Sequence, residues 1–353
     1  MDIDVKLTQN PRTIPEYGKD QVPFGKLFTD HMFLMDYSVD KGWHDARILP
    51  YGDILLSPAA NSIHYGQSIF EGMKAYKSPG DNVLLFRPFE NAARFNASAH
   101  RMCMPEIMPE AMVEAVARLV EIDKGWIPKV PGMSLYIRPF MFATEAMVNV
   151  TLPETFMFGV LLSPVGSIMG TGEAMRLVAE EEYVRAAPGG TGAAKCAGNY
   201  AAAMRAVTQA KAKGYDQVLW LDATHRRYVE EASAMNVFFV MGDTVVTPEL
   251  TGTILEGITR KSVIDILRGW GWKVEERKLA IDEVVEAAKA GSLTEAFSAG
   301  TAAVIGPIGE ITWGDQVVRI GGVGELTKRV YDELTGIQTG TRPDERAWVY
   351  KVC

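Results

Sequence analysis

Two strand-like runs joined by a two-residue turn are the feature that most constrains the fold. The runs NVFFVM and TVVTPE flank Gly242 and Asp243, and glycine beside a polar residue between two such runs is typical of a β-hairpin. The β-rich segments 134–144 and 155–165 are also expected to pair, and a short hairpin is expected around GEITWGD. Because helical segments alternate with these hairpins, the sequence predicts a mixed α+β fold rather than a doubly wound parallel sheet.

The predicted elements fall on both sides of a glycine-rich stretch. Three glycines occur in GSIMGTGEA, which predicts an interdomain linker at 166–174 between a smaller N-terminal domain, 1–165, and a larger C-terminal domain, 175–353. Residues 1–50 are expected to form an extended arm with short strands. Apolar residues recur at spacings of three and four in 108–126, which predicts a helix, and 89–102 has helical composition. Further helices are expected at 201–213, 254–271, 281–291 and 324–334. EAFSAGTAAVI, 295–305, is expected to form one strand.

Composition excludes several classes of function. The 353 residues carry a formal net charge of -8 without a basic stripe, which argues against nucleic-acid binding. The three cysteines have no CxxC spacing and the five histidines are scattered, so neither a disulfide framework nor a metal site is indicated. No apolar stretch has the length of a signal peptide or a membrane span, which leads us to expect a cytoplasmic protein.

One lysine stands in an unusual setting, in PGGTGAAKCAGNY at 188–200. Small residues let another molecule approach the backbone closely, and Lys195 could form a Schiff base with an aldehyde such as pyridoxal phosphate (PLP). The phenol of Tyr200 could bond the ring hydroxyl of that cofactor. A solvated surface lysine is the alternative interpretation. A phosphate-binding P-loop is excluded, because Ala194 and Cys196 replace the glycine and the hydroxyl residue that flank its lysine.

Together with four other segments, this stretch resembles the branched-chain aminotransferases of fold type IV, which use PLP. The resemblance runs from about Phe24 to Tyr350, with five motifs in the family's order. It implies a homodimer that transfers the amino group of L-leucine, L-isoleucine or L-valine to 2-oxoglutarate, giving glutamate. In the family's KxxGNY motif, the lysine holds the cofactor and moves the substrate proton, which assigns these roles to Lys195 with Tyr200 as the phenol.

The resemblance also assigns the residues that bind the cofactor. YVEEASAMNVF places Glu231 opposite the pyridine nitrogen, where a carboxylate keeps that nitrogen protonated; a solvated pair with Glu230 is the alternative. Arg94 in ENAARF resembles the phosphate arginine, and Arg185 is a weaker candidate in the same region. The remaining phosphate donors stand at an expected helix start and in SAGTAA, and they are Gly257, Ile258, Thr259 and Thr301.

The substrate residues are implied by IHYGQSIFEGMKAY, LYIRPF and SAGTAA. Phe70 and Tyr136 resemble walls of the family's apolar pocket, as does Tyr65, although aromatic residues on strands are equally typical of a core. Arg138 is expected to meet the distal carboxylate of glutamate, directly or by orienting Tyr136. The backbone N–H groups that would receive the substrate α-carboxylate are those of Ala302 and Ala303.

The sequence departs from the family at a few positions, and other functions of the same fold remain as alternatives. Ala303 and Gly306 occupy the places of a redox CxxC found in mammalian members, and Ala234 replaces a threonine. The connection around Met147 and Val148 is expected to cross the dimer interface. The alternatives are a D-amino acid aminotransferase, an aminodeoxychorismate lyase of the same fold, or a catalytically silent PLP-binding protein.

Overall fold

The computed structural model describes residues 1–18, 22–166 and 173–353. The chain divides into two compact units. Unit 1 comprises Met1–Ser167, Ala194–Gly198 and Gly336–Cys353, and unit 2 comprises Ile168–Ala193 and Asn199–Thr335. The segment that carries Lys195 therefore belongs to unit 1, although the chain on either side of it belongs to unit 2.

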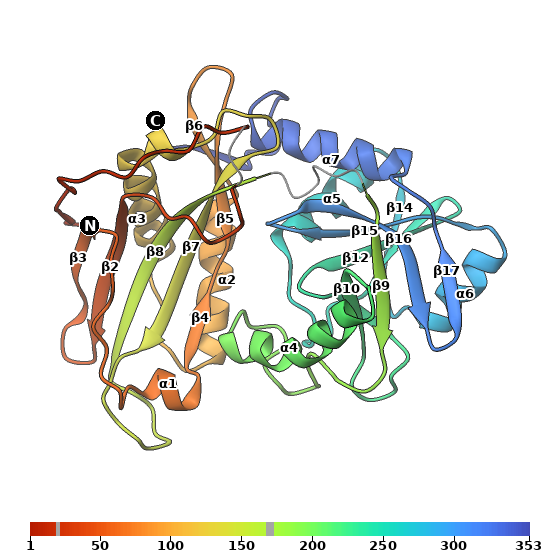
Figure 1. Cartoon of the computed structure of the whole chain (residues 1–353), viewed down its shortest axis with the longest axis horizontal. Helices are drawn as coiled ribbons and strands as arrows, with labels where there is room; N and C mark the ends of the chain where they lie inside the picture. The colour runs from red at the N-terminus through yellow and green to blue at the C-terminus, as the bar shows by residue number, and fades with distance from the viewer. Residues whose placement is uncertain (19–21, 167–172) are drawn as a thin grey trace. The chain divides into compact units, whose positions relative to one another are not determined.

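Unit 1 is a nine-stranded sheet with two helices packed on it (Figure 1). The strand order is β1-β3-β2-β8-β7-β5-β6-β18, with β4 paired to β7, and every pairing except β1 with β3 is antiparallel. Its strands are β1 Asp4–Val5, β2 His31–Ser38, β3 Gly42–Pro50, β4 Ser68–Phe70, β5 Met73–Lys77, β6 Val83–Phe86, β7 Ser134–Ala143, β8 Thr155–Val165 and β18 Val349–Lys351. Its helices are α1 Asn61–Tyr65, α2 Pro88–Arg101, α3 Pro109–Ile122 and the 3-10 turn η1 Lys124–Trp126.

The core of unit 1 lies between the sheet and the helices α2 and α3. The buried helix side chains repeat at spacings of three and four, such as Met112, Val116 and Leu119 of α3, which is the spacing that places them on one face. They pack with sheet residues that include Phe33 and Phe158, both fully buried. The sheet is therefore a rigid platform for the residues on its strands and connections.

Unit 2 is a second nine-stranded sheet of mixed direction. Its order is β11-β10-β9-β16-β15-β12-β13-β14, with β17 paired to β16, and an isolated bridge joins Ala232 of β11 to Met235 across the turn that leads to β12. Its strands are β9 Met175–Glu180, β10 Gln217–Leu221, β11 Val229–Ala232, β12 Asn236–Met241, β13 Thr244–Thr247, β14 Lys273–Glu276, β15 Leu293–Gly300, β16 Val304–Trp313 and β17 Gln316–Arg319. The helices that begin or lie in this part of the chain are α4 Ala197–Ala212, α5 Ile258–Gly269, α6 Ile281–Lys289 and α7 Glu325–Gln338.

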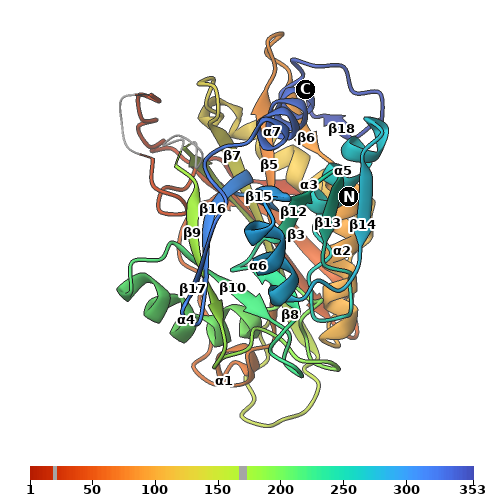
Figure 2. The ribbon, with the colours of Figure 1, turned by 90° about the vertical axis from the view of Figure 1, so that its right-hand side faces the viewer.

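Helices cover the unit 2 sheet at separate places. Val284 and Val285 of α6 pack into the main core with β12 and β15, and Figure 2 shows α6 in front of these strands. Ala206 and Ala210 of α4 pack instead on β10, beside the fully buried Trp220. No helix of the described residues is long and apolar enough to cross a membrane.

Much of the predicted secondary structure is confirmed. The mixed α+β class is observed, and β7 pairs with β8 over ten residues from Ser134 to Ala143. The hairpin at Gly242 and Asp243 joins β12 to β13, and Gly242 has the positive φ of 61° that a tight turn requires. The linker predicted at 166–174 falls mostly on 167–172, which lie outside the described residues, so it stays a prediction along with the domain boundaries.

Three expectations about local structure are wrong. Residues 31–50 do not form an arm with short strands, because β2 and β3 make a long hairpin whose first strand is buried. The short helix α1 lies at Asn61–Tyr65, where no helix was expected. The single strand expected at 295–305 is broken by a turn at 301–303, which separates β15 from β16 and lets the two pair as a hairpin.

Candidate active site

The backbone around Lys195 is fixed by the sheet of unit 1. The N–H of Phe70 on β4 donates to the carbonyl oxygen of Lys195 at 3.0 Å, and the N–H of Lys195 donates to Ser98 Oγ of α2 at 2.9 Å. The next residue, Cys196, is buried in the core and forms a β-bridge with Ile69. The lysine is thus held on a packed platform, as a residue with a geometric task requires.

The electrostatic setting of Lys195 favours a neutral amine. Burial is the largest cause that lowers the pKa of Lys195 below its usual value, and the positive charge of Arg94 is the second. Glu71 and Tyr136 act in the opposite direction, while Arg138 adds to the lowering. A neutral lysine amine is a nucleophile and a proton acceptor, which is the property that the sequence predicted for this residue.

Arg94 of α2 is bound by a carboxylate that the sequence interpretation missed. Its Nε donates to Glu71 Oε1 at 2.6 Å, and its Nη2 donates to Glu71 Oε2 at 2.8 Å. Glu71 is fully buried and also accepts the N–H of Gly72 at 2.9 Å. The available signal was an acidic residue within the apolar segment around FEGMKAY. Since both carboxylate oxygens hold the guanidinium, Glu71 fixes the orientation of Arg94.

The aromatic residues predicted to line the substrate pocket lie around Arg138. Its guanidinium carbon is 4.7 Å from the ring centroid of Phe70 and 5.3 Å from that of Tyr136, and its Nη2 donates to the Tyr136 hydroxyl at 3.2 Å. Lys195 Nζ lies 5.0 Å from the same Phe70 ring. The Nε atom of Arg138 is buried and has no hydrogen-bond partner in the described chain. Arg138 therefore has a donor available for an anion.

Other residues of unit 1 complete or border this cluster. A Cβ at Gly72 would lie 2.1 Å from the Tyr136 hydroxyl, so this close approach requires glycine. Lys74 faces Tyr136 across the β5 to β7 ladder, and burial lowers its pKa to about 7; the sequence interpretation did not select it. Tyr65 lies apart from these contacts, on α1 with 41% of its surface exposed, and its assignment stays a prediction.

In unit 2, Glu231 of β11 lies at the wall of a cavity. Only 2% of its surface is exposed, and its Oε2 forms an ion pair with Arg185 Nε at 2.7 Å. Its Oε1 accepts the N–H of Leu255 at 3.1 Å and the amide of Asn236 at 3.3 Å. The cavity, of about 180 Å³, is lined by Arg185, Asn199, Tyr200, Ala203, Met204, Val207, Glu231, Ser233, Ala234 and Leu255. Glu231 and Tyr200, selected separately from the sequence, thus share one cavity.

Arg185 is anchored by backbone carbonyl groups. Its Nη2 donates to the carbonyl oxygens of Gly192 at 3.0 Å and Thr253 at 2.5 Å, which leaves Nε for Glu231. The sequence suggested Arg185 as a weak candidate near the phosphate. Its ion pair with Glu231 makes it the residue that balances the charge of that carboxylate.

The predicted phosphate donors stand at the start of α5. Gly257 is the N-cap residue, and no side chain of the described residues caps the helix. The first-turn N–H groups, including those of Ile258 and Thr259, therefore lie where the helix dipole favours an anion. A Cβ at Gly257 would lie 2.0 Å from Asn236 Oδ1. Asn236 thus binds Glu231 and packs on the helix start, which makes it a positioning residue that the interpretation used only as motif context.

Thr301, Ala302 and Ala303 form the turn between β15 and β16. The turn is followed by Val304, whose φ of 63° is unusual for a β-branched residue and marks local strain. Strain of this kind is concentrated at functional sites. The predicted roles of these three residues as anion donors stay predictions.

The residues present fit pyridoxal phosphate. A lysine with a lowered pKa suits a Schiff base, a buried carboxylate on a cavity wall suits a protonated ring nitrogen, and an uncapped helix start suits a phosphate. No group of three or more His, Cys, Asp or Glu side chains that could hold a metal ion occurs in the described ranges. The donor set is therefore that of an organic phosphate-bearing aldehyde.

Comparison with known proteins agrees with this interpretation of the site. The chain is 51% identical to branched-chain-amino-acid aminotransferase 2 of Bacillus subtilis (strain 168), over 99% of this chain and 97% of that protein. It superposes with a TM-score of 0.77 on the branched-chain aminotransferase of Thermoproteus uzoniensis solved with norvaline, at 26% identity over 92% of this chain and 100% of the other. The holo form with PLP of the Thermobaculum terrenum enzyme gives a TM-score of 0.74 at 25% identity, over 91% and 98% of the two chains. Because the model of the family amino-transferase class IV also matches residues 68–311, this chain belongs to that family.

Proposed function

We propose that this protein is a branched-chain aminotransferase, which reversibly transfers the amino group of L-leucine, L-isoleucine or L-valine to 2-oxoglutarate. The observation that carries the proposal is the Lys195 cluster, in which a lysine with a lowered pKa stands beside aromatic walls and an arginine with an available donor. One pocket of this kind suits both an aliphatic side chain and a carboxylate, which the two half-reactions require.

The cofactor is pyridoxal phosphate, which the class IV family uses and which supplies an aldehyde and an electron-accepting ring. Lys195 would hold the aldehyde, with Tyr200 at the ring hydroxyl and Glu231 at the pyridine nitrogen. Arg94 would bind the phosphate, together with Gly257, Ile258, Thr259 and Thr301. Glu71 and Arg185 support this set by orienting Arg94 and Glu231.

Lys195 Nζ would accept the proton from the substrate α-carbon. This step needs a neutral amine, and burial together with Arg94 lowers the pKa of Lys195 in that direction. Glu231 would lie at the pyridine nitrogen, and its carboxylate is held in place by an ion pair with Arg185 and by hydrogen bonds from Leu255 N–H and the amide of Asn236.

The substrate would lie against Phe70, Tyr136 and Tyr65, with Arg138 serving the second carboxylate of glutamate or 2-oxoglutarate. The unused Nε of Arg138 supports this role, since a buried N–H without a partner is stabilised by an anion that reaches it. The N–H groups of Ala302 and Ala303 are proposed to receive the α-carboxylate.

A second copy of the chain is proposed to pack on an exposed apolar patch of unit 1. Leu55 is fully exposed, and Val150 and Leu152 have 81% and 67% of their surface exposed. The amide of Asn61 donates to the carbonyl oxygen of Asn149, so the chain near Asn61 lies beside the connection that carries Met147 and Val148. Apolar patches of this kind mark protein interfaces. Val150→Asp with Leu152→Asp should convert a dimer to a monomer in sedimentation analysis, and a native monomer would contradict the proposal.

The activity is tested by measuring glutamate formed from 2-oxoglutarate with each branched-chain L-amino acid, and with D-alanine as donor. We expect turnover with the L-amino acids and none with D-alanine. Faster turnover of D-alanine would favour the D-amino acid aminotransferase alternative and reject this proposal. A cytoplasmic location also stays a prediction, which the free thiols of Cys103, Cys196 and Cys353 support.

A further inference from the structure

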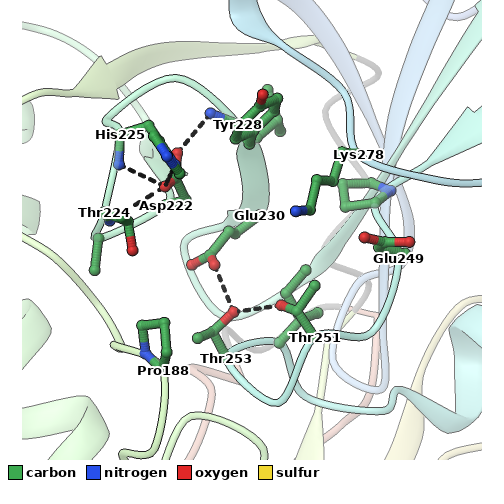
Figure 3. A pocket seen from close by; sticks show the side chains of 14 residues that line it. Pro188, Asp222, Thr224, His225, Tyr228, Glu230, Glu249, Thr251, Thr253 and Lys278 are labelled. Carbon is green, nitrogen blue, oxygen red and sulfur yellow. Dashed lines mark hydrogen bonds and ion pairs between the residues drawn. The ribbon is translucent and has the colours of Figure 1, made fainter.

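Unit 2 contains a second cavity, on the other face of β11 from Glu231. Adjacent residues of a strand point to opposite faces, so Glu230 and Glu231 face different surroundings. Glu230 lies in the wall of a cavity of about 120 Å³, shown in Figure 3. Its lining comes from the turn between β10 and β11, the segment after β13 and the segment after β14. None of its residues is assigned to the cofactor or the substrate, although the carbonyl oxygen of Thr253 anchors Arg185.

Glu230 has an unsatisfied oxygen in this cavity. Only 5% of its surface is exposed, and its Oε1 accepts the hydroxyl of Thr253 at 2.5 Å. Its Oε2 is buried and has no hydrogen-bond partner within the described residues. Burial raises the pKa of Glu230, which means that its surroundings disfavour the charged form. A buried acceptor without a partner is costly, and a ligand that donates a charged hydrogen bond would offset this cost.

The acidic neighbour Asp222 is committed to its own turn. Its Oδ2 accepts the N–H groups of Thr224 and His225, and its Oδ1 accepts those of Arg227 and Tyr228, as Figure 3 shows in part. These bonds hold the pKa of Asp222 at about 2, against the opposing effect of its burial. Asp222 therefore builds the wall and offers little to a ligand.

Lys278 supplies a positive charge on the opposite wall. Figure 3 shows its ammonium group directed toward the side of the cavity where Glu230 lies. Glu249 also lines the cavity. Lys278 forms no ion pair with a described carboxylate, and its Nζ lies 5.7 Å from the centroid of the Tyr228 ring. The cavity thus presents one carboxylate oxygen without a hydrogen-bond partner and one ammonium group without an ion pair among the described residues.

The rest of the lining is largely apolar. The residues that contribute it are Pro188, Tyr228, Val229, Pro248 and Ile254. Such walls suit a small aliphatic side chain that lies beside the two charged groups. A metal ion is a poor match, since no cluster of three ligating side chains occurs here or elsewhere in the described residues.

We propose that this cavity binds a free α-amino acid with a short aliphatic side chain, whose ammonium group donates to Glu230 Oε2 and whose carboxylate accepts from Lys278. The site would be separate from the residues assigned to catalysis. Opposite charges at both ends of the cavity match a zwitterion, whereas a simple amine or a simple carboxylate would satisfy only one end.

The test is calorimetric titration of L-valine into holoenzyme in which borohydride has reduced the bond between Lys195 and the cofactor. We expect saturable binding that weakens at least tenfold in Glu230→Gln and likewise in Lys278→Gln. The matched controls are Glu286→Gln and Lys289→Gln, which remove the same charges from an exposed ion pair on α6. These controls should bind valine as the parent does. Any binding of valine at the substrate residues should be the same in all five proteins, which are the parent and the four variants.

The outcomes separate the alternatives. Equal binding in all five proteins, or no saturable binding in the parent, would overturn the proposal. Loss in Glu230→Gln with full retention in Lys278→Gln would also overturn it, because it would show a site for amines alone. Thermal unfolding of each variant checks that the fold is retained; Glu230→Gln keeps an acceptor for Thr253. The binding measured does not depend on turnover, so it stands or fails separately from the proposed activity.

Discussion

The two units each bury a pair of one arginine and one glutamate, but the partners have opposite tasks. In unit 1, Glu71 commits both oxygens to Arg94 and to the N–H of Gly72. In unit 2, Arg185 commits its Nη2 to two backbone carbonyl groups and balances Glu231. The first carboxylate orients an arginine, and the second arginine stabilises a carboxylate. The same ion pair can therefore prepare a site for an anion or for a cation, depending on which partner the backbone immobilises.

Arg138 extends the comparison as an arginine without an ion pair in the described residues. It lies between aromatic rings, and its Nε is buried without a partner. In this account its carboxylate partner is the substrate. Removing each of the three arginines, or its partner, should therefore change a different property of the protein.

Glu231→Gln should give the largest loss. We expect kcat to fall by roughly 10²–10³-fold, the range for removing one electrostatic partner of a reacting group. The cofactor should stay bound through Lys195, because the lysine contacts in unit 1 are unchanged. Steady-state kinetics with L-leucine measures the effect, with Glu286→Gln as the exposed control. Full activity in Glu231→Gln would show that the ion pair of Arg185 and Glu231 is not required for the reaction.

Arg138→Gln should separate the two substrates. A hydrogen bond to a charged group contributes about 1.5–3 kcal/mol, so KM for glutamate and 2-oxoglutarate should rise by roughly 10- to 100-fold. KM for L-leucine, which lacks the second carboxylate, should change much less. Kinetics with each donor and acceptor measures this difference. An equal rise for leucine and glutamate would show that Arg138 only supports the fold of the pocket.

Glu71→Gln and Arg94→Gln should shift the pKa of Lys195 in opposite directions. Glu71 raises this pKa and Arg94 lowers it. Because only the neutral amine reacts with an aldehyde, the pH midpoint for the reaction of apoenzyme with pyridoxal should fall in Glu71→Gln and rise in Arg94→Gln. A nearby charge typically moves a pKa by about one pH unit or more.

Pyridoxal lacks the phosphate, so the measurement is independent of the proposed phosphate contact of Arg94. Shifts of the same sign in both variants would contradict the opposing roles assigned to the unit 1 pair. Thermal unfolding is the control, since breaking a buried ion pair costs about 3–5 kcal/mol.

Tyr200→Phe should have the smallest effect. It removes one hydroxyl from the cavity that Glu231 lines and keeps the ring. A single neutral hydrogen bond contributes about 0.5–1.5 kcal/mol, so the affinity for pyridoxal phosphate should fall by roughly 3- to 10-fold. Equilibrium dialysis of the cofactor measures this change. An effect as large as that of Glu231→Gln would mean that the two residues do not have the separate roles assigned here.

The sequence predicted elements with local signals and missed those set by tertiary contacts. The hairpin at Gly242 and the pairing of β7 with β8 follow from turn residues and β-rich runs. The break at 301–303 was missed because Thr301, Ala302 and Ala303 carry no turn signal, and the strained φ of Val304 is imposed by its surroundings.

In the candidate site, too, residues within motifs were predicted and residues set by tertiary contacts were missed. The motifs selected Lys195, Glu231 and Arg94, but not Glu71, whose pairing with Arg94 joins positions 23 residues apart. The role of Arg185 was placed near the phosphate, whereas its partners are Glu231 and backbone carbonyl groups. Pairings of this kind depend on how the strands and helices pack, which a motif does not encode.

The central claim is that Lys195 holds pyridoxal phosphate and serves the transfer of an amino group from a branched-chain amino acid. The most direct measurement is the visible absorption spectrum of the purified protein with pyridoxal phosphate, before and after L-leucine, repeated with Lys195→Ala. We expect the band of the lysine-bound cofactor, its conversion by leucine to the spectrum of the pyridoxamine form, and no catalytic conversion in the variant. A native protein that develops no such band after incubation with pyridoxal phosphate, or a variant that turns over normally, would contradict the claim.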